Sequence, residues 1–466
     1  MAKILFFDPP QRTDIYLKTN VSIGALSYPS LTLATLAGNL ARGHDVRIID
    51  LDLVGDFYGY ILKEIGTFHP DIVAASALTP TYFVIRNIMR KIKEKYPHIK
   101  TIVGGAHVTA LPDEAAKDGC FDIIVLGEGD TVIPELLSAH DAKDVAGIIY
   151  KDPSSAKFVR TADRKLAEDL NSLPYPSWGL FSLDKYKHSR LSSRRNPVGL
   201  METSRGCAFQ CNFCNKLIFG TAHRVKEPGR VVDEMEYMLK CGFKEIHIAD
   251  DSFTQKIDRA KEVCAEIIRR RLKFPWSLLN GVRADMVDLE FFKLAKRAGC
   301  WQVGFGIESG DQDVLNAVNK KIKLPQVEHA VSAAKKAGVD TLGFFILGLS
   351  GETEKSMRRT IKFAKRLPLS IAKFDLCIPY PGTPYYNDLK SAGRIKSEDW
   401  SKYNVHQLES PLFEHPNLSW TMINSYYKKA FRQFYLRPNY ILRRFARSLA
   451  MGDLLYDIRY FFKSKW

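Results

Sequence analysis

The 466-residue sequence has no long apolar run and few cysteines. No apolar stretch approaches the roughly 20 residues that cross a bilayer. The segment MAKILFFDPP reaches Asp8 and two prolines before the apolar core of a signal peptide could form. Eight cysteines in a chain of this length do not make a disulfide scaffold. We therefore expect a cytoplasmic protein, because thiols stay reduced in that compartment.

The composition is that of an ordinary globular protein, with 45% hydrophobic and 26% charged residues. The chain is too long for a single compact core, so two or three domains are expected. The formal net charge is +16, and residues 427–466 hold ten Lys or Arg against two Asp, which is half of that excess. A basic segment of this kind could contact lipid phosphates, nucleic acid or an acidic partner, or it could be a solvated surface.

Residues 1–150 alternate short apolar runs with segments of helical periodicity. Five runs predict strands, and each ends near Gly, Asp or Pro: KILFFDP, DVRIIDLD, DIVAASAL, TIVGGAH and DIIVLGEG. Strands that alternate with helices indicate a Rossmann-like, doubly wound parallel sheet, whose ligands bind at the carboxyl ends of the strands. Residues 151–196 are rich in Pro and aromatic residues without periodicity, and they are interpreted as a linker.

A second alternating series covers residues 197–390 and predicts a partial (β/α)6 barrel, so the fold class is α/β. In such barrels the chemistry lies where the strands end, and five candidate residues fall there: Cys207, Asp251, Arg283, Glu308 and Glu352. Residues 391–466 predict a helical, basic and amphipathic region. In YILRRFARSLA, Leu442, Phe445 and Leu449 share one helix face, and Arg443, Arg444 and Arg447 share the other.

The stretch RGCAFQCNFCNK holds three cysteines, Cys207, Cys211 and Cys214. A structural zinc site needs four ligands, so zinc would require a distant residue such as His223. A four-iron cluster normally takes four thiolates, and three would leave one iron open for chemistry. A cluster, a zinc site and three core cysteines that meet by accident all remain open at this point.

Residues 198–216 resemble the cluster loop of the radical S-adenosylmethionine (SAM) superfamily. The resemblance implies that Cys207, Cys211 and Cys214 hold a [4Fe–4S] cluster whose open iron binds SAM. It also implies that IADDS, GIESG, GFFILGLSGET and PYPGTPYY surround the SAM molecule, with Asp251 a likelier contact than Asp250. The residues that would contact SAM are Phe213, Asp250, Asp251, Arg283, Glu308, Ser309, Gly348 and Pro379.

The first 150 residues resemble the cobalamin-binding domain that precedes the barrel in cobalamin-dependent radical SAM enzymes. The implied cobalamin-binding residues are Ser76, Thr79, Thr81, Gly104, Gly105, His107, Gly127, Glu128 and Gly129. The motif D-x-H-x-x-G, which supplies a cobalt-binding imidazole in other cobalamin proteins, is missing, because Pro9, Pro10, Gln11 and Arg12 follow Asp8. The cobalt is therefore expected to lack a protein imidazole, and a domain without any ligand is the alternative.

The resemblance implies a methyltransferase that cleaves SAM reductively and moves a methyl group from methylcobalamin to an unactivated carbon of a small molecule or lipid. An oxidative cyclase, ring-contraction or hydroxylation enzyme with the same cofactors is one alternative, and a non-catalytic corrinoid sensor is another. The expected partners are the substrate, an electron donor such as flavodoxin or ferredoxin and, through residues 427–466, the inner face of the cell membrane. A tail that packs on the barrel is the alternative to membrane contact, and nucleic-acid binding is not expected.

Overall fold

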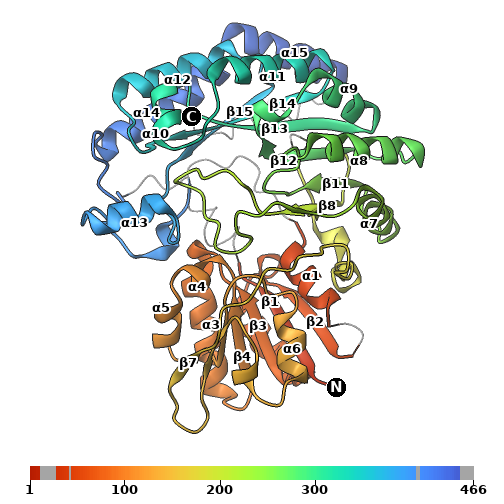
Figure 1. Cartoon of the computed structure of the whole chain (residues 1–466), viewed down its shortest axis with the longest axis vertical. Coiled ribbons are helices and arrows are strands. Elements are labelled where there is room, and N and C mark those ends of the chain that lie inside the picture. The colour runs from red at the N-terminus through yellow and green to blue at the C-terminus, as the bar shows by residue number, and fades with distance from the viewer. Residues whose placement is uncertain (11–27, 41–42, 191, 406–409, 452–466) are drawn as a thin grey trace.

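The computed structural model describes residues 1–10, 28–40, 43–190, 192–405 and 410–451. Two α/β units lie one above the other in Figure 1. The chain around residues 200–225, drawn in yellow-green, runs between them. The predicted α/β class and the two successive sheets are confirmed.

The first sheet has seven strands in the order β2-β1-β3-β4-β5-β6-β7. Its parallel part follows the predicted runs: β1 (Lys3–Asp8), β2 (Asp45–Asp50), β3 (Ile72–Ser76), β4 (Lys100–Gly104) and β5 (Ile123–Val125). The sheet then continues antiparallel through β6 (Ile148–Lys151) and β7 (Phe158–Arg160). The sheet thus extends beyond residue 150 and is not parallel throughout. The sequence gives no apolar signal for β7, because this strand has only three residues and none of them is fully buried.

Helices cover both faces of this sheet, since successive side chains of a strand point to opposite faces. Ile4 and Phe6 of β1 belong to the core that includes α1 and α6, whereas Leu5 and Phe7 belong to the core that includes α2 and α3. The helices are α1 (Leu31–Gly38), α2 (Phe57–Phe68), α3 (Tyr82–Lys95), α4 (Ala106–Ala110), α5 (Pro112–Lys117) and α6 (Val132–Ser138). The carboxyl edge of the sheet faces the second unit (Figure 1).

The second sheet is an open, all-parallel barrel segment with the order β15-β14-β13-β12-β11-β8. Its strands are β8 (Val198–Met201), β11 (Glu245–Ile248), β12 (Trp276–Val282), β13 (Cys300–Glu308), β14 (Asp340–Leu347) and β15 (Ile371–Leu376). A short antiparallel ribbon, β9 (Ser204–Arg205) with β10 (Arg224–Val225), follows β8. The helices are α7 (Pro228–Lys240), α8 (Ile257–Arg269), α9 (Leu289–Arg297), α10 (Gln312–Ala317), α11 (Leu324–Lys336), α12 (Glu354–Arg366) and α13 (Pro384–Ser391).

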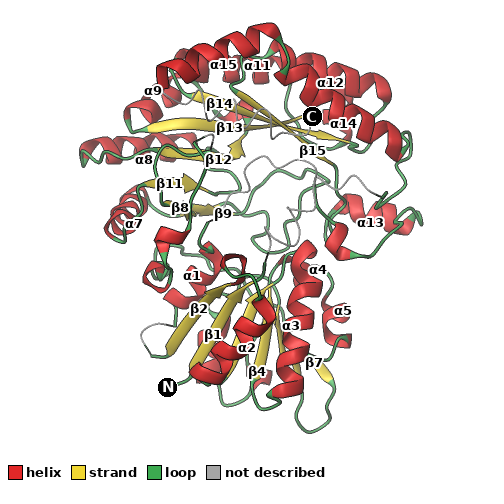
Figure 2. Cartoon of the chain, turned by 180° about the vertical axis from the view of Figure 1, so that it is seen from behind, coloured by secondary structure: helices red, strands yellow, loops and turns green. Residues whose placement is uncertain are grey.

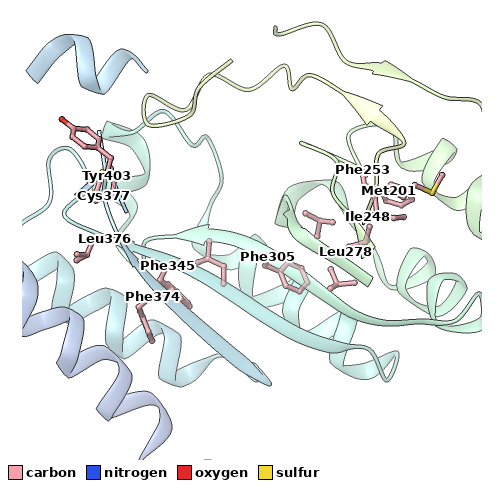
Figure 3. Close-up of a cluster of buried hydrophobic side chains, with 14 of the residues drawn as sticks. Met201, Ile248, Phe253, Leu278, Phe305, Phe345, Phe374, Leu376, Cys377 and Tyr403 are labelled. Carbon is pink, nitrogen blue, oxygen red and sulfur yellow. The ribbon is translucent and has the colours of Figure 1, made fainter. Parts of the chain in front are cut away.

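The two faces of this barrel segment differ. Helices cover its outer face (Figure 2), where buried aromatic side chains such as Phe345 and Phe374 stack with ring centroids 5.3 Å apart (Figure 3). On β14 the residues that alternate with these, Leu342, Phe344 and Ile346, are only partly buried. The inner face therefore offers apolar side chains that are accessible from the interior of the barrel.

The end of the chain closes the barrel and also returns to the first unit. Helix α14 (Trp420–Tyr435) packs on β15, where the Tyr435 hydroxyl donates to the Ala372 carbonyl at 2.7 Å. Helix α15 (Pro438–Met451) follows it. The 3₁₀ turn Trp400–Lys402 contacts the first unit, since the Trp400 indole donates to Glu114 at 2.7 Å. Residues 452–466 of the predicted basic region lie outside the described residues. Among the described helices, none is long and apolar enough to cross a membrane.

Candidate active site

The backbone that leads from β8 into the cysteine loop is held by Asp250. This buried carboxylate accepts hydrogen bonds from the Thr203 amide at 2.5 Å, the Thr203 hydroxyl at 2.5 Å and the Ser204 hydroxyl at 2.6 Å. Asp250 lies two residues beyond the end of β11, the neighbour of β8 in the sheet. Both carboxylate oxygens of Asp250 therefore accept hydrogen bonds from the loop. Asp250 was also among the residues predicted from the sequence to contact SAM.

A sharp turn at Gly206 carries the chain from this anchored segment to Cys207. Gly206 has φ +79°, and a Cβ atom there would approach the Ala222 carbonyl oxygen to 2.3 Å, so only glycine fits. Beyond the turn, Cys211 is buried, Cys207 is half-buried and Cys214 is exposed. The three thiols of the loop therefore range from buried to exposed.

The donor set fits a cluster better than a single zinc ion. No three His, Cys, Asp or Glu side chains among the described residues converge closely enough to hold one metal ion. A zinc site built from the three cysteines and His223 would require such convergence, whereas a cluster gives each thiolate its own iron. Burial raises the pKa of the Cys211 thiol above its ordinary value. The nearby cations Lys320 and Arg283 offset part of this rise.

Asp251 and Glu308, two of the residues predicted to contact SAM, differ in burial and in their partners. Asp251 is exposed and accepts one hydrogen bond, from the Gly206 amide at 3.2 Å. Glu308 ends β13 with a φ of +64° and accepts from the Lys320 ammonium at 2.7 Å. A Cβ at Gly306 would approach both charged groups to 3.0 Å or less, so this glycine leaves room for the ion pair. Carboxylates in these positions suit the amino group and the ribose hydroxyls of SAM.

The other predicted SAM residues are engaged within the protein. Arg283 donates to the Lys320 carbonyl at 2.8 Å and stacks 3.5 Å from the Phe209 ring centroid in the cysteine loop. Ser309 is buried and shares a hydrogen bond of 3.0 Å with Thr360. The remaining three lie as follows: the Gly348 amide donates to Glu352 at 2.5 Å, Pro379 is buried, and Phe213 is half-buried against the core.

The expected cobalamin-binding residues gather at the carboxyl edge of the first sheet. Ser76 ends β3, Gly104 ends β4, and Gly105 packs so closely that a Cβ would meet Ala77 and the Ser76 hydroxyl within 2.8 Å. Gly127 has φ +73° and faces open space, and Leu78 is 46% exposed beside the buried Thr79 and Thr81. Gly129 lies against Leu36. An open edge with an exposed leucine fits a large ligand with apolar faces, as cobalamin has.

His107 lies away from the open part of this edge. Its ring is fully buried between Tyr82, at a centroid distance of 4.2 Å, and Trp400, at 5.3 Å. Burial lowers the pKa of His107 to about 3, so the imidazole is neutral. Nδ1 lies 3.4 Å from the Thr79 hydroxyl, and Nε2 is buried without a hydrogen-bond partner.

Glu128 takes part in an ionic network that joins the two units. It pairs with Arg224 at 2.6 Å and with Arg205 at 3.4 Å, and Arg205 binds both oxygens of Asp130 at 2.8 and 2.9 Å. Glu202 completes the set at 2.6 Å from Arg205. Asp130, Arg205 and Arg224 were not among the site residues expected from the sequence. The local signal in the sequence is Arg205 itself, a charged residue only two positions before the predicted cluster ligand Cys207.

A second network that the sequence analysis missed lies on β11. The fully buried Glu245 accepts from His247 Nε2 at 2.8 Å and from the Trp301 indole at 2.8 Å. Since a carboxylate only accepts, Nε2 carries a proton, and Nδ1 lies 2.6 Å from the Tyr28 hydroxyl. The spacing Glu-x-His within a strand, which puts both side chains on one face, could have predicted the pair.

Comparison with known proteins agrees with this geometry. Residues 201–364 match the model of the radical SAM superfamily, and residues 21–137 match that of the B12 binding domain. An uncharacterized methyltransferase of Pyrococcus horikoshii is 33% identical over 95% of this chain and 94% of its own length. The anaerobic magnesium-protoporphyrin IX monomethyl ester cyclase of Rubrivivax gelatinosus is 30% identical over 81% and 69%. The radical SAM methyltransferase TsrM of Kitasatospora setae, solved with cobalamin and a [4Fe-4S] cluster, has the same fold, with a TM-score of 0.71 at 19% identity over 92% and 91%.

A three-cysteine loop at the mouth of a partial barrel, facing a Rossmann-like domain across the carboxyl edges of both sheets, defines a radical SAM enzyme with a second cofactor domain. The chain belongs to the family of radical SAM enzymes that carry an amino-terminal cobalamin-binding domain. Its cofactors are a [4Fe–4S] cluster, SAM and cobalamin, as the motifs predicted.

Asp250 accepts several hydrogen bonds from the loop, whereas the exposed Asp251 accepts one from the Gly206 amide, and this difference gives a first testable prediction. Asp251→Asn should keep about four irons per chain but weaken SAM binding roughly tenfold or more, because a hydrogen bond to a charged group is lost. Iron analysis and titration of the reduced cluster's electron paramagnetic resonance signal with SAM measure the two properties. Alanine at all three cysteines is the control and should abolish iron binding. Equal SAM affinity in Asp251→Asn and the wild type would show that Asp251 does not contact SAM.

Glu352 gives a prediction about pH. Burial raises the pKa of Glu352 to about 8, and its Oε1 has no hydrogen-bond partner, so the folded protein holds it as a neutral acid. Because the folded-state pKa lies above the unfolded value, its contribution to stability is complete at low pH and is lost as pH rises towards 8. The urea midpoint of the wild type should therefore fall between pH 5 and 8 by more than that of Glu352→Gln.

The neighbouring residue provides the control for this measurement. Hydrogen bonds from Tyr426 and Arg358 lower the pKa of the exposed Glu354, so this carboxylate stays charged throughout the same pH range. Glu354→Gln should keep the pH slope of the wild type. Identical slopes for the wild type and Glu352→Gln would contradict the assignment of a neutral acid.

Proposed function

We propose that this radical SAM enzyme is a C-methyltransferase whose substrate carbon lies between the cysteine loop and the cobalamin domain. The observation that carries the proposal is the placement of the loop. Cys214 is exposed, and both Leu217, a few residues further along the loop, and Ala110 of the cobalamin domain pack against Gly382. When bound, the cluster and SAM supply a carbon-centred radical and cobalamin supplies the methyl group.

The chain's own residues then act by binding, orientation and exclusion of water. Asp251 and Glu308 hold the two ends of SAM, and Lys320 fixes the Glu308 carboxylate through the ion pair of 2.7 Å. Arg283 braces the cysteine loop through Phe209. No side chain is assigned as a general base, because removal of a hydrogen atom by a radical requires none. An acidic electron donor of the flavodoxin or ferredoxin class would suit a chain with a net charge of +16.

The inner face of the barrel favours an apolar substrate. Leu342, Phe344 and Ile346 are accessible there, and a Cβ at Gly304 would come within 2.8 Å of the Phe344 ring, so the ring packs against this glycine. The Lys373 ammonium is 6.0 Å from the same ring centroid. This surface matches a hydrophobic body with a polar or anionic end.

The reaction stoichiometry tests the proposal against its rivals. With reductant, SAM and the extract of a deletion strain, a methyltransferase should release S-adenosylhomocysteine and 5′-deoxyadenosine in about equal amounts. The resemblance to a cyclase raises the second candidate, a pure oxidation, which would yield 5′-deoxyadenosine without S-adenosylhomocysteine. Mass spectrometry quantifies both products. A protein that releases neither would be a corrinoid sensor, and the proposal would be wrong.

We also propose that α15 rests on the anionic inner face of the cell membrane, which would bring the enzyme to apolar substrates. Leu442, Phe445 and Leu449 are 66%, 50% and 55% exposed, so this face of α15 does not pack on the barrel. Arg443 is exposed on the same helix. An apolar stripe beside basic residues is typical of an interfacial helix, and each basic residue adds on the order of 1 kcal/mol at an anionic leaflet.

Flotation with anionic liposomes tests this contact. The full-length protein should float with the liposomes at low salt and less at high salt, because the arginine contribution is screened. Leu442→Asn with Phe445→Asn should reduce the floating fraction several-fold, since apolar burial is lost. Leu180→Asn, at a residue 37% exposed in the linker, is the matched control and should float as the wild type does. Wild-type protein that stays at the bottom at low salt would remove the membrane proposal.

A further inference from the structure

The ionic network between the two domains lies immediately before the cluster ligands. Arg205 is two residues before Cys207 and comes from the barrel unit, while Glu128 and Asp130 come from the loop after β5 of the cobalamin domain. The side chains are 5% exposed for Arg205, 6% for Glu128 and 9% for Asp130. The fork of Arg205 binds both oxygens of Asp130 in a bidentate pair, the most geometrically specific ion pair available to proteins.

The ribbon that carries Arg205 cannot neutralise its own charges. In the β9–β10 ribbon, Arg224 lies directly opposite Arg205. Like charges in directly opposed positions destabilise an antiparallel pair. Glu128 reaches both arginines and Asp130 reaches Arg205, so two of the compensating carboxylates belong to the other domain. The ribbon therefore gains its full complement of counter-charges only when the cobalamin domain is docked against it.

We propose that Arg205, Arg224, Glu128 and Asp130 form an interdomain clamp that fixes the cluster loop relative to the cobalamin domain, and that they are positioning residues for the reaction. Gly206 connects the clamp to Cys207 through a turn that only glycine fits. Asp250 fixes Thr203 and Ser204 on the other side of Arg205. A change in docking is thus transmitted over two residues to the first cluster ligand. Pairs of this kind are better suited to setting one geometry than to adding stability, because desolvation offsets much of their attraction.

The number of positive and negative groups in the clamp shows which substitution should disturb folding least. The clamp with Glu202 holds two arginines and three carboxylates within hydrogen-bond distance. Asp130→Asn leaves two of each sign and keeps the side-chain shape, so folding should be preserved while the bidentate contact is lost. Arg205→Lys is a second variant that keeps the charge but not the fork. Glu135→Gln is the matched control, because Glu135 pairs with Arg164 near the same loop without reaching the barrel.

The experiment measures amide hydrogen exchange and product ratio on full-length protein loaded with cluster and cobalamin. With iron and cobalamin contents equal to those of the wild type, Asp130→Asn should exchange at least about tenfold faster in residues 203–207 and 126–131, because these segments then open locally. The ratio of S-adenosylhomocysteine to 5′-deoxyadenosine should fall at least about fivefold, since methyl transfer to cobalamin needs both cofactors in register while cleavage of SAM at the cluster needs one. Glu135→Gln should change neither.

The product ratio is informative only if the proposed methyl transfer is correct, whereas hydrogen exchange is not tied to it. The two measurements therefore distinguish a failure of the clamp from a failure of the proposed function. Unchanged exchange and an unchanged ratio in Asp130→Asn would overturn the clamp, and so would faster exchange spread over the whole cobalamin domain, which indicates a merely structural role. Wild-type protein that releases no S-adenosylhomocysteine would instead overturn methyl transfer, and the exchange measurement would still decide on the clamp. If Asp130→Asn does not fold, Arg205→Lys must show the same localised exchange and the same lowered ratio for the clamp to stand.

Discussion

The short segment of residues 203–206 is the part of the molecule on which the active site depends. Carboxylates hold it from three directions: Asp250 from within the barrel, Asp130 from the cobalamin domain and Asp251 at the Gly206 amide. Each carboxylate lies in a loop that follows a parallel strand, β5 for Asp130 and β11 for Asp250 and Asp251. Acceptors fixed by two rigid sheets can hold a loop that has almost no regular structure of its own, and a cluster loop needs such support because its thiolates must match the fixed geometry of the irons.

Each domain contributes a different part of the ligand space at the facing sheet edges. Parallel strands present their carboxyl ends on one side only, so a Rossmann-like sheet and a barrel that face each other enclose the ligands of both. The barrel adds an inner face that is apolar on β14, and the first sheet adds glycines that leave its edge open. Charged groups lie in the Glu308–Lys320 pair, in the interdomain network and in the Lys373–Asp375 pair of β15.

Local sequence patterns were sufficient for the parallel strands of both sheets. The run Lys3–Asp8 and the other apolar runs that end in Gly or Asp form the parallel strands, because burial on both faces requires continuous hydrophobic sequence. Strand β7 was not predicted, because it has only three residues and they are partly or fully exposed. The site was less predictable where it depends on contacts between distant residues: Arg205 and Asp130 are 75 positions apart, and Tyr28 and His247 are 219 apart. For the same reason Ser309 and Asp250, which lie at strand ends as predicted, proved to be engaged with neighbouring side chains.

The return of the chain at Trp400 restricts how the enzyme can open. The first domain is joined to the rest at Glu114 by Trp400, at Asp130 by Arg205, at Asp50 by Tyr186 and at Tyr28 by His247. These four contacts involve different segments of the first domain. A hinge about one of them would break the others, so a wide rigid-body opening is costly. Exchange of a ligand as large as cobalamin therefore requires local release of one contact, with the remaining three keeping the two halves aligned.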